Sequence, residues 1–137
     1  MAHDALIFDA IRTPRGKGKP GGSLYEVKPI DLLVNLMEAM KQRNELDTSR
    51  VEDLVIACGE PVGEQGQDIA RTAVNYSSWD DATAGVQIHR FCAGGLDAVN
   101  MAAAKVAAGF EDLVAAGGVE SMSRIGIGAS GGAQGDP

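Results

Sequence analysis

Cysteine, histidine and aromatic residues are scarce in this chain of 137 residues. It holds two cysteines, Cys58 and Cys92, two histidines, one tryptophan, two tyrosines and three phenylalanines. Two cysteines do not make a disulfide framework, so we predict free thiols in a reducing compartment. We predict neither a metal site nor a bound cofactor.

Net positive charge and long apolar runs are also lacking. The 19 acidic residues outnumber the 12 basic ones, and the net charge of −7 argues against binding nucleic acid or an anionic membrane. No apolar run approaches the length of a membrane span. The opening "MAHDALIFDAIRTP" lacks the basic stretch and the long apolar stretch of a signal peptide. These absences predict a cytoplasmic chain that binds neither nucleic acid nor membrane.

Short apolar runs alternate with helical patterns along the chain. Each apolar run is nearly continuous, which is typical of strands buried on both faces of a parallel sheet. The sequence therefore predicts an α/β fold of layered helices and strands. We expect strands at 5–14, 54–58, 85–91 and 113–116, and helices at 29–43, 67–76 and 95–109. The glycine-rich tail from residue 126 has no apolar periodicity and predicts a mobile loop.

Cys92 lies between a predicted strand and a predicted helix, in the stretch "HRFCAGGLDAVN". The amino-terminal end of a helix favours an anion, and a thiolate is such an anion. Gly94 and Gly95 would let a bulky thioester approach the sulfur and the helix backbone. The position alone leaves two interpretations open, a nucleophile or a small buried residue. Cys58 lies within a predicted strand, and we expect it to be structural.

Four segments together carry a resemblance to a known family. "HRFCAGGLDAVNMAA" and "LVAAGGVESMSR" resemble the active-site region of the thiolases, the acetyl-CoA C-acyltransferases, whose turn reads N-R-x-C-x-S-G-[LQ]-x-A and whose next strand leads into G-G-x-E-S-M-S. "DAIRTPRGKGKPGGSL" resembles the start of that family, and "GEQGQDIAR" its G-Q-N-x-A-R segment. The four segments occur in the family's order, with the spacings intact. A thiolase-like N-terminal half is therefore expected, a layered α/β/α fold with a mixed, mainly parallel sheet.

The resemblance implies a chemistry for Cys92. It would be the nucleophile that forms an acyl-thioester intermediate, in 3-ketoacyl-CoA thiolysis or in the reverse Claisen condensation. Coenzyme A thioesters would be substrates rather than bound cofactors. A related decarboxylating condensing enzyme is an alternative that "GGVESMS" disfavours.

The resemblance also implies an oligomer, either a homodimer or a dimer of dimers. Gln67 would lie at the dimer interface near the active site. The strand with Val86, Gln87 and Ile88 would pair with its symmetry mate.

Two residues beside Cys92 depart from the family pattern. Gly94 replaces a small hydroxyl residue, and this change is expected to loosen the turn without removing the nucleophile. His89 replaces an asparagine. Strand positions three apart point to opposite faces, which disfavours His89 as a base for Cys92. We expect a buried, hydrogen-bonded replacement for the asparagine instead.

The resemblance covers only the first half of a thiolase. Residues 1–118 would form the N-terminal α/β domain, and residues 119–137 the start of the loop domain. The N-E-A-F, G-H-P and C-x-G motifs do not occur in the sequence. The C-terminal thiolase half, in the same protein or in a second chain, would then supply the histidine base and the second cysteine. The chain by itself is expected to be inactive, and a non-catalytic assembly piece is the alternative.

Overall fold

Three parallel strands form the sheet at the centre of the molecule. The computed structural model describes residues 4–132, and within them the sheet has the strand order β2-β1-β3. The strands are β1 (Asp53–Ala57), β2 (Val86–Ile88) and β3 (Val114–Gly118). β1 lies in the middle because it pairs with both neighbours, Val55 opposite Val86 on one side and Val55 opposite Ala116 on the other. All five residues of β1 are buried.

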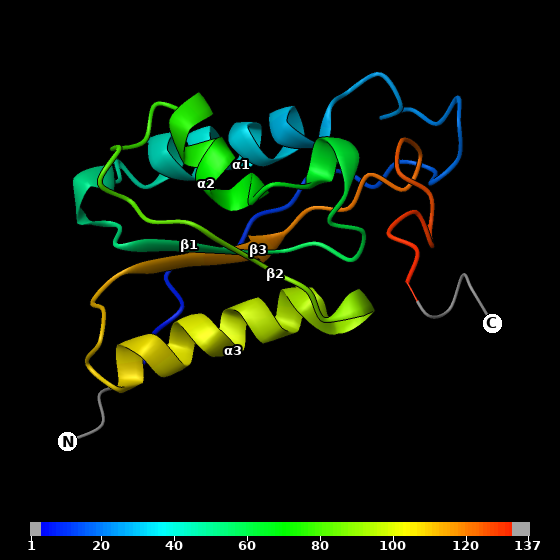
Figure 1. The fold of residues 1–137 in the computed structure, drawn as a ribbon. Coiled ribbons are helices and arrows are strands. Elements are labelled where there is room, and N and C mark those ends of the chain that lie inside the picture. Colours follow the sequence, from blue (N-terminus) through cyan, green and yellow to red (C-terminus); the bar gives the residue numbers. More distant parts are fainter. Residues whose placement is uncertain (1–3, 133–137) are drawn as a thin grey trace.

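Helices cover both faces of this sheet. Figure 1 shows α1 (Pro29–Arg43) and α2 (Ile69–Tyr76) on one face and α3 (Gly94–Ala107) on the other. Pro29 occupies the first turn of α1, where its missing N–H costs no hydrogen bond. Asp68 caps α2 by accepting a hydrogen bond from the backbone N–H of Arg71, at 3.3 Å.

Alternate residues of β1 supply two different cores. Leu54 and Ile56 join the larger core under α1 and α2. Val55 and Ala57 face α3, where they pack with Ala98. The second core consists of small side chains, so α3 lies close to the sheet. Because strand residues alternate between faces, this one five-residue run holds both helical layers in place.

Three short 3-10 turns complete the described elements. They are η1 (Thr48–Arg50), η2 (Gly63–Gln65) and η3 (Phe91–Ala93). The strands are parallel, so their carboxyl ends meet at one edge of the sheet. η2 follows β1 and η3 follows β2 at that edge, and residues 119–121 follow β3 there. This edge is where open α/β sheets bind ligands.

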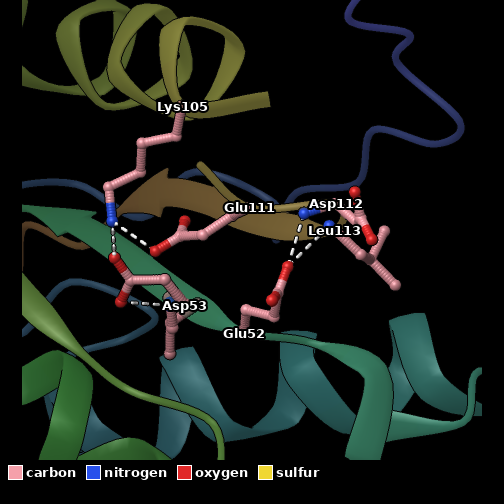
Figure 2. Close-up of polar contacts among 7 residues, drawn as sticks. Glu52, Asp53, Lys105, Glu111, Asp112 and Leu113 are labelled. Atoms are coloured by element: carbon pink, nitrogen blue, oxygen red, sulfur yellow. Dashed lines mark hydrogen bonds and ion pairs between the residues drawn. The ribbon is translucent and has the colours of Figure 1, made fainter. Parts of the chain in front are cut away.

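Charged residues hold the opposite, amino-terminal end of the sheet. Figure 2 shows Lys105 reaching from α3 to Asp53 of β1 and to Glu111, which lies just before β3. The Lys105 Nζ lies 2.9 Å from a carboxylate oxygen of Glu111. Burial by itself would lower the pKa of Lys105, but the hydrogen bonds to the two carboxylates raise it. Glu52 accepts hydrogen bonds from the backbone N–H groups of Asp112 and Leu113. α3 is thus tied to the sheet at the end opposite Cys92.

The α/β class, three strands and three helices agree with the sequence prediction, with shifted ends. The strand predicted at 85–91 is shorter, Val86–Ile88, and the helix predicted at 95–109 is Gly94–Ala107. The other elements differ from prediction by two residues or fewer. All strands of residues 4–132 are parallel, so no antiparallel strand of a mixed sheet occurs among them.

The strand predicted at residues 5–14 was wrong. This segment has no regular secondary structure, and Leu6, Ile7 and Phe8 are 71%, 78% and 84% exposed. A strand needs a neighbour to pair its backbone, and within residues 4–132 β3 pairs only with β1. Asp9 instead fixes the segment to the end of α1, where its carboxylate accepts a hydrogen bond from Asn44 at 2.8 Å.

Two further predictions concern the loop at the end of the chain and the domain boundary at residue 118. Residues 119–132 form turns and bends without helix or strand, as predicted for the part from residue 126. The predicted boundary at residue 118, between the N-terminal α/β domain and the loop domain, stays a prediction. Residues 1–3 of the first domain and residues 133–137 of the second lie outside the described residues. Among residues 4–132 no helix is long and apolar enough to cross a membrane.

Candidate active site

Cys92 lies in the turn that joins β2 to α3. Its thiol is free and exposed, in the middle of η3. The turn is sharp because Phe91 has a φ of +46°, in the left-handed region that side chains such as phenylalanine rarely adopt. The turn lies at the edge of the sheet where the carboxyl ends of the three parallel strands meet. The structure therefore presents this cysteine at the surface and does not bury it.

The amino-terminal end of α3 begins directly after this turn. Ala93 occupies the N-cap position, and an alanine side chain cannot accept hydrogen bonds from the first helical N–H groups. Arg90, which precedes η3, forms an ion pair with Asp97 in the first turn of α3, with 2.8 Å between Nε and Oδ2. Cys92 thus stands beside a helix end that favours negative charge.

The two glycines after Cys92 differ in their surroundings. A Cβ on Gly94 would lie 2.7 Å from the Cβ of Ala57, so a side chain at residue 94 would force α3 or β1 to shift. A Cβ on Gly95 would meet nothing within 4 Å. Gly94 is therefore a packing residue, whereas Gly95 leaves open space at the surface. This contact gives a physical reason for glycine where a hydroxyl residue was expected.

Cys58 has the opposite environment. It is 2% exposed at the carboxyl end of β1, and its thiol lies 3.9 Å from Oε1 of Glu120. Burial raises the pKa of this thiol to about 11, and the charge of Glu120 adds to the rise. A thiol with this pKa is protonated at neutral pH and is a poor nucleophile. The structure agrees with the expectation that Cys58 is structural.

Gln65 and Glu120 form a polar network beneath the turn. Gln65 is fully buried, and its Nε2 donates hydrogen bonds to Oε1 of Glu120 at 2.8 Å and to the backbone oxygen of Glu60 at 3.1 Å. Its Oε1 accepts from the backbone N–H of Ser121 at 2.6 Å. The other carboxylate oxygen of Glu120 accepts from the N–H of Gly59 at 2.5 Å. Every polar atom of the Gln65 side chain is thus bonded.

The sequence alone predicts no role for Gln65 or Glu120. Both residues lie within segments that carried the family resemblance, "GEQGQDIAR" and "GGVESMSR". A buried glutamine and an acidic residue at a strand end were the available signal. Their separation of 55 residues concealed the contact until the fold placed β1 beside β3.

The residues predicted at a dimer interface lie along one side of the molecule. Val86, Gln87 and Ile88 are half-buried in β2, an edge strand within the described residues. Gln67 is exposed and has a φ of +54°. The Gln87 side chain turns inward, where its Nε2 donates to the backbone oxygen of Gln65 at 2.5 Å and its Oε1 accepts from the N–H of Ile69.

The prediction of a buried His89 was wrong. His89 is exposed because β2 ends at Ile88, before the sheet can cover it. Its Nδ1 accepts a hydrogen bond from the backbone N–H of Phe91 at 3.4 Å, and the two rings meet edge to face at 4.6 Å. It is thus hydrogen-bonded, as expected, and it braces the turn. No group of three or more potential metal ligands occurs in the part of the chain that the structure describes.

A comparison with protein families identifies this arrangement. The family described as "Thiolase, N-terminal domain" matches residues 5–134. The chain belongs to the thiolase family. That match covers every described strand and helix, including the turn with Cys92 and the segments with Gln65 and Glu120.

Named relatives and a solved structure agree with this assignment. The chain is 40% identical over 125 residues to the beta-ketoadipyl-CoA thiolase of Pseudomonas knackmussii, covering 90% of this chain and 31% of the relative. It is 39% identical over 122 residues to the 3-oxoadipyl-CoA/3-oxo-5,6-dehydrosuberyl-CoA thiolase of Escherichia coli, covering 88% and 30%. The crystal structure of the Bacillus anthracis acetyl-CoA acetyltransferase superposes with a TM-score of 0.82 at 30% identity, covering 90% of this chain and 30% of that one. This thiolase chain therefore spans about a third of the length of these proteins.

The two cysteines of this thiolase chain are predicted to differ in reactivity. Iodoacetamide at pH 8 should alkylate Cys92 at least a hundredfold faster than Cys58, since a thiol with a pKa of about 11 has a thiolate fraction on the order of 0.001 at that pH. The Cys58 rate should rise as the pH approaches 11. Peptide mass spectrometry measures both rates, and Cys92→Ala gives the Cys58 rate separately. Equal labelling of the folded chain would contradict the assignment, whereas equal labelling in urea is expected.

The glycine pair gives a second prediction. Gly94→Ala should destabilise the fold by about 1–3 kcal/mol, because the added methyl group overpacks the contact with Ala57. Adding Ala57→Gly should recover part of that loss. The matched control, Gly95→Ala, meets open space and should leave stability unchanged within about 1 kcal/mol. Urea unfolding followed by circular dichroism measures all three, and equal stability of the two alanine variants would refute the packing role.

Proposed function

We propose that this chain supplies the acyl-accepting nucleophile of a thiolase, an acyltransferase that acts on coenzyme A thioesters. The reaction is thiolysis of a 3-ketoacyl-CoA or its reverse, the Claisen condensation. One observation carries the proposal, the exposed Cys92 thiol at the turn into α3, in a chain of the thiolase family.

The thiol suits a two-step transfer. In thiolysis the sulfur of Cys92 attacks the 3-keto carbon, a carbon–sulfur bond forms, and the bond to the neighbouring α-carbon breaks. Acetyl-CoA leaves after that α-carbon takes up a proton. The thiol of a second CoA then receives the acyl group from Cys92, and a proton returns to the Cys92 sulfur. Gly95 leaves the approach to this sulfur open, since a Cβ there would meet no atom within 4 Å.

Proton transfer in both steps needs a base. Cys92 has no hydrogen-bonded base among residues 4–132, and His89 Nδ1 is engaged with the backbone of Phe91. We infer that a histidine base and a second cysteine come from polypeptide outside these 137 residues, a C-terminal thiolase half in the same protein or in another chain. The name of a relative, the 3-ketoacyl-CoA thiolase of Acinetobacter baylyi, supports 3-ketoacyl-CoA substrates. A place in fatty acid β-oxidation is part of the proposal. A cytoplasmic location is part of the proposal.

Acetyl transfer tests the function. The chain replaces the matching first third of the E. coli relative, and the folded chimera is incubated with acetyl-CoA. An acetyl group on Cys92 is expected by peptide mass spectrometry. Cys92→Ala should abolish it, and Cys58→Ala should retain it, because Cys58 is buried and protonated. A folded chimera without the label, or with the label elsewhere, would support the alternative, an assembly piece without catalysis.

We also propose a homodimer, or a dimer of dimers, in which β2 pairs with its symmetry mate. Support comes from the edge position of β2 and the half-buried side chains of Val86, Gln87 and Ile88. Gln67 lies exposed on the segment that leads into α2 and would join this interface.

Cross-linking of the assembled protein tests the dimer. A cysteine introduced at Val86 should form cross-links between subunits, and one at the exposed Ser49, which is remote in sequence from β2, should not. Mass spectrometry of the linked peptides measures both. Cross-links at Ser49 with none at Val86 would place the interface elsewhere.

A further inference from the structure

Hydrogen bonds of Gln65 and Glu120 reach all three strands or the residues that follow them. Glu120 follows β3 by two residues, and its carboxylate accepts the N–H of Gly59, which follows β1. Gln65 donates to the same carboxylate. The backbone oxygen of Gln65 accepts from Gln87 of β2. The amide–carboxylate pair thus connects the residues that follow β1 and β3, and the backbone of Gln65 links it to β2.

This pair reaches the nucleophile turn through Gly59. A Cβ on Gly59 would lie 2.7 Å from Oε2 of Glu120 and 3.9 Å from the carbonyl carbon of Phe91. The backbone of Gly59 therefore lies close to both the Glu120 carboxylate and the residue that precedes Cys92. The neighbouring N–H of Cys58 donates to the backbone oxygen of Ile88 at 3.0 Å, at the end of β2.

The turn needs such support because its own geometry is unfavourable. Phe91 has a left-handed φ of +46°, a conformation that persists only where the surroundings enforce it. Local contacts at the turn are the hydrogen bond from Phe91 to His89, at 3.4 Å, the backbone bond from the N–H of Ala93 to the oxygen of Arg90, at 3.1 Å, and the exposed ion pair of Arg90. Gln65, in contrast, is fully buried and bonded at each polar atom.

We propose that Gln65 and Glu120 are positioning residues for the nucleophile, which hold the strained turn at Phe91 and so fix Cys92 at the amino-terminal end of α3. The inference rests on the proposed function of Cys92. Neither side chain is proposed to touch the Cys92 sulfur or the substrate. They act through Gly59 and through the end of β2.

The polarity of the pair makes the proposal testable by exchange of the two residues. In Glu120→Gln, one of the two acceptor positions becomes an NH2 donor, so either Gly59 or Gln65 faces a donor instead of an acceptor. In Gln65→Glu, a carboxylate faces a carboxylate, and the amide donor to Oε1 of Glu120 is lost. In the double variant Gln65→Glu/Glu120→Gln, the new amide donates to the new carboxylate and accepts from Gly59, while residue 65 still accepts from Ser121. The double variant loses the bond to the backbone oxygen of Glu60, and it brings a buried carboxylate oxygen close to that carbonyl.

Hydrogen–deuterium exchange of the 137-residue chain measures the effect. Each single variant should exchange about tenfold faster in the peptide that spans residues 89–95, the factor expected for loss of one hydrogen bond to a charged group. Exchange in α1, on the far side of the sheet, should stay unchanged. The double variant should exchange more slowly at 89–95 than either single variant, returning toward the wild-type rate. Val119→Ala, a cavity variant beside Glu120, is the control for general destabilisation and should not act selectively on the turn.

Each outcome decides the proposal. Equal acceleration in α1 and in the turn, or no acceleration, would show a merely structural role and overturn it. A double variant that exchanges as fast as the single variants would also overturn it. If a single variant does not fold, a folded double variant with wild-type exchange supports the pairing, and an unfolded one contradicts it. Exchange does not require acyl transfer, so a failed acetylation assay and a failed positioning test are distinguishable.

Discussion

Close packing of α3 on β1 is the constraint on which the candidate site depends. Gly94 and Ala57 meet where any larger residue at position 94 would collide, so the helix begins directly against the central strand. The residue two positions earlier, Cys92, then has to lie above the carboxyl edge of the sheet and outside its core. At the other end of α3, Lys105 pairs with Asp53 on the same strand (Figure 2). The helix is fixed to β1 at both ends, and this placement also sets the position of the turn that precedes it.

The same sheet gives its two cysteines different chemistry. Cys58 directly follows a strand that is buried on both faces, and desolvation and the Glu120 carboxylate disfavour its thiolate. Cys92 follows an edge strand that ends four residues earlier, and the chain has left the core before the thiol is reached. The two residues are of the same type, and burial alone leaves the Cys92 thiol accessible and the Cys58 thiol covered. This difference is consistent with the role that thiolase membership suggests for Cys92.

The polar network beneath the turn links the fold to this chemistry. A buried glutamine without its partners would carry a large desolvation cost, so the contacts of Gln65 with Glu120, Glu60 and Ser121 are strongly specified. They bring together backbone groups that follow β1 and β3. The strained φ of Phe91 then has a neighbour, Gly59, whose position is fixed. The hydrogen bonds of Gln65 and Glu120 connect all three strands of the sheet, and through them the turn is held in place.

The sequence by itself determined the family, the α/β class, the approximate strands and helices and the candidate nucleophile, because motifs and apolar periodicity are local patterns. Tertiary structure alone decided the rest. The apolar segment 5–14 forms no strand, since a strand depends on a neighbour that its own residues cannot specify. His89 is exposed, since the length of β2 is set by its pairing with β1. Gln65 meets Glu120, and Gly94 meets Ala57, across separations that only the packed sheet closes. Contacts between distant residues depend on the relative placement of whole elements, and no local pattern encodes that placement.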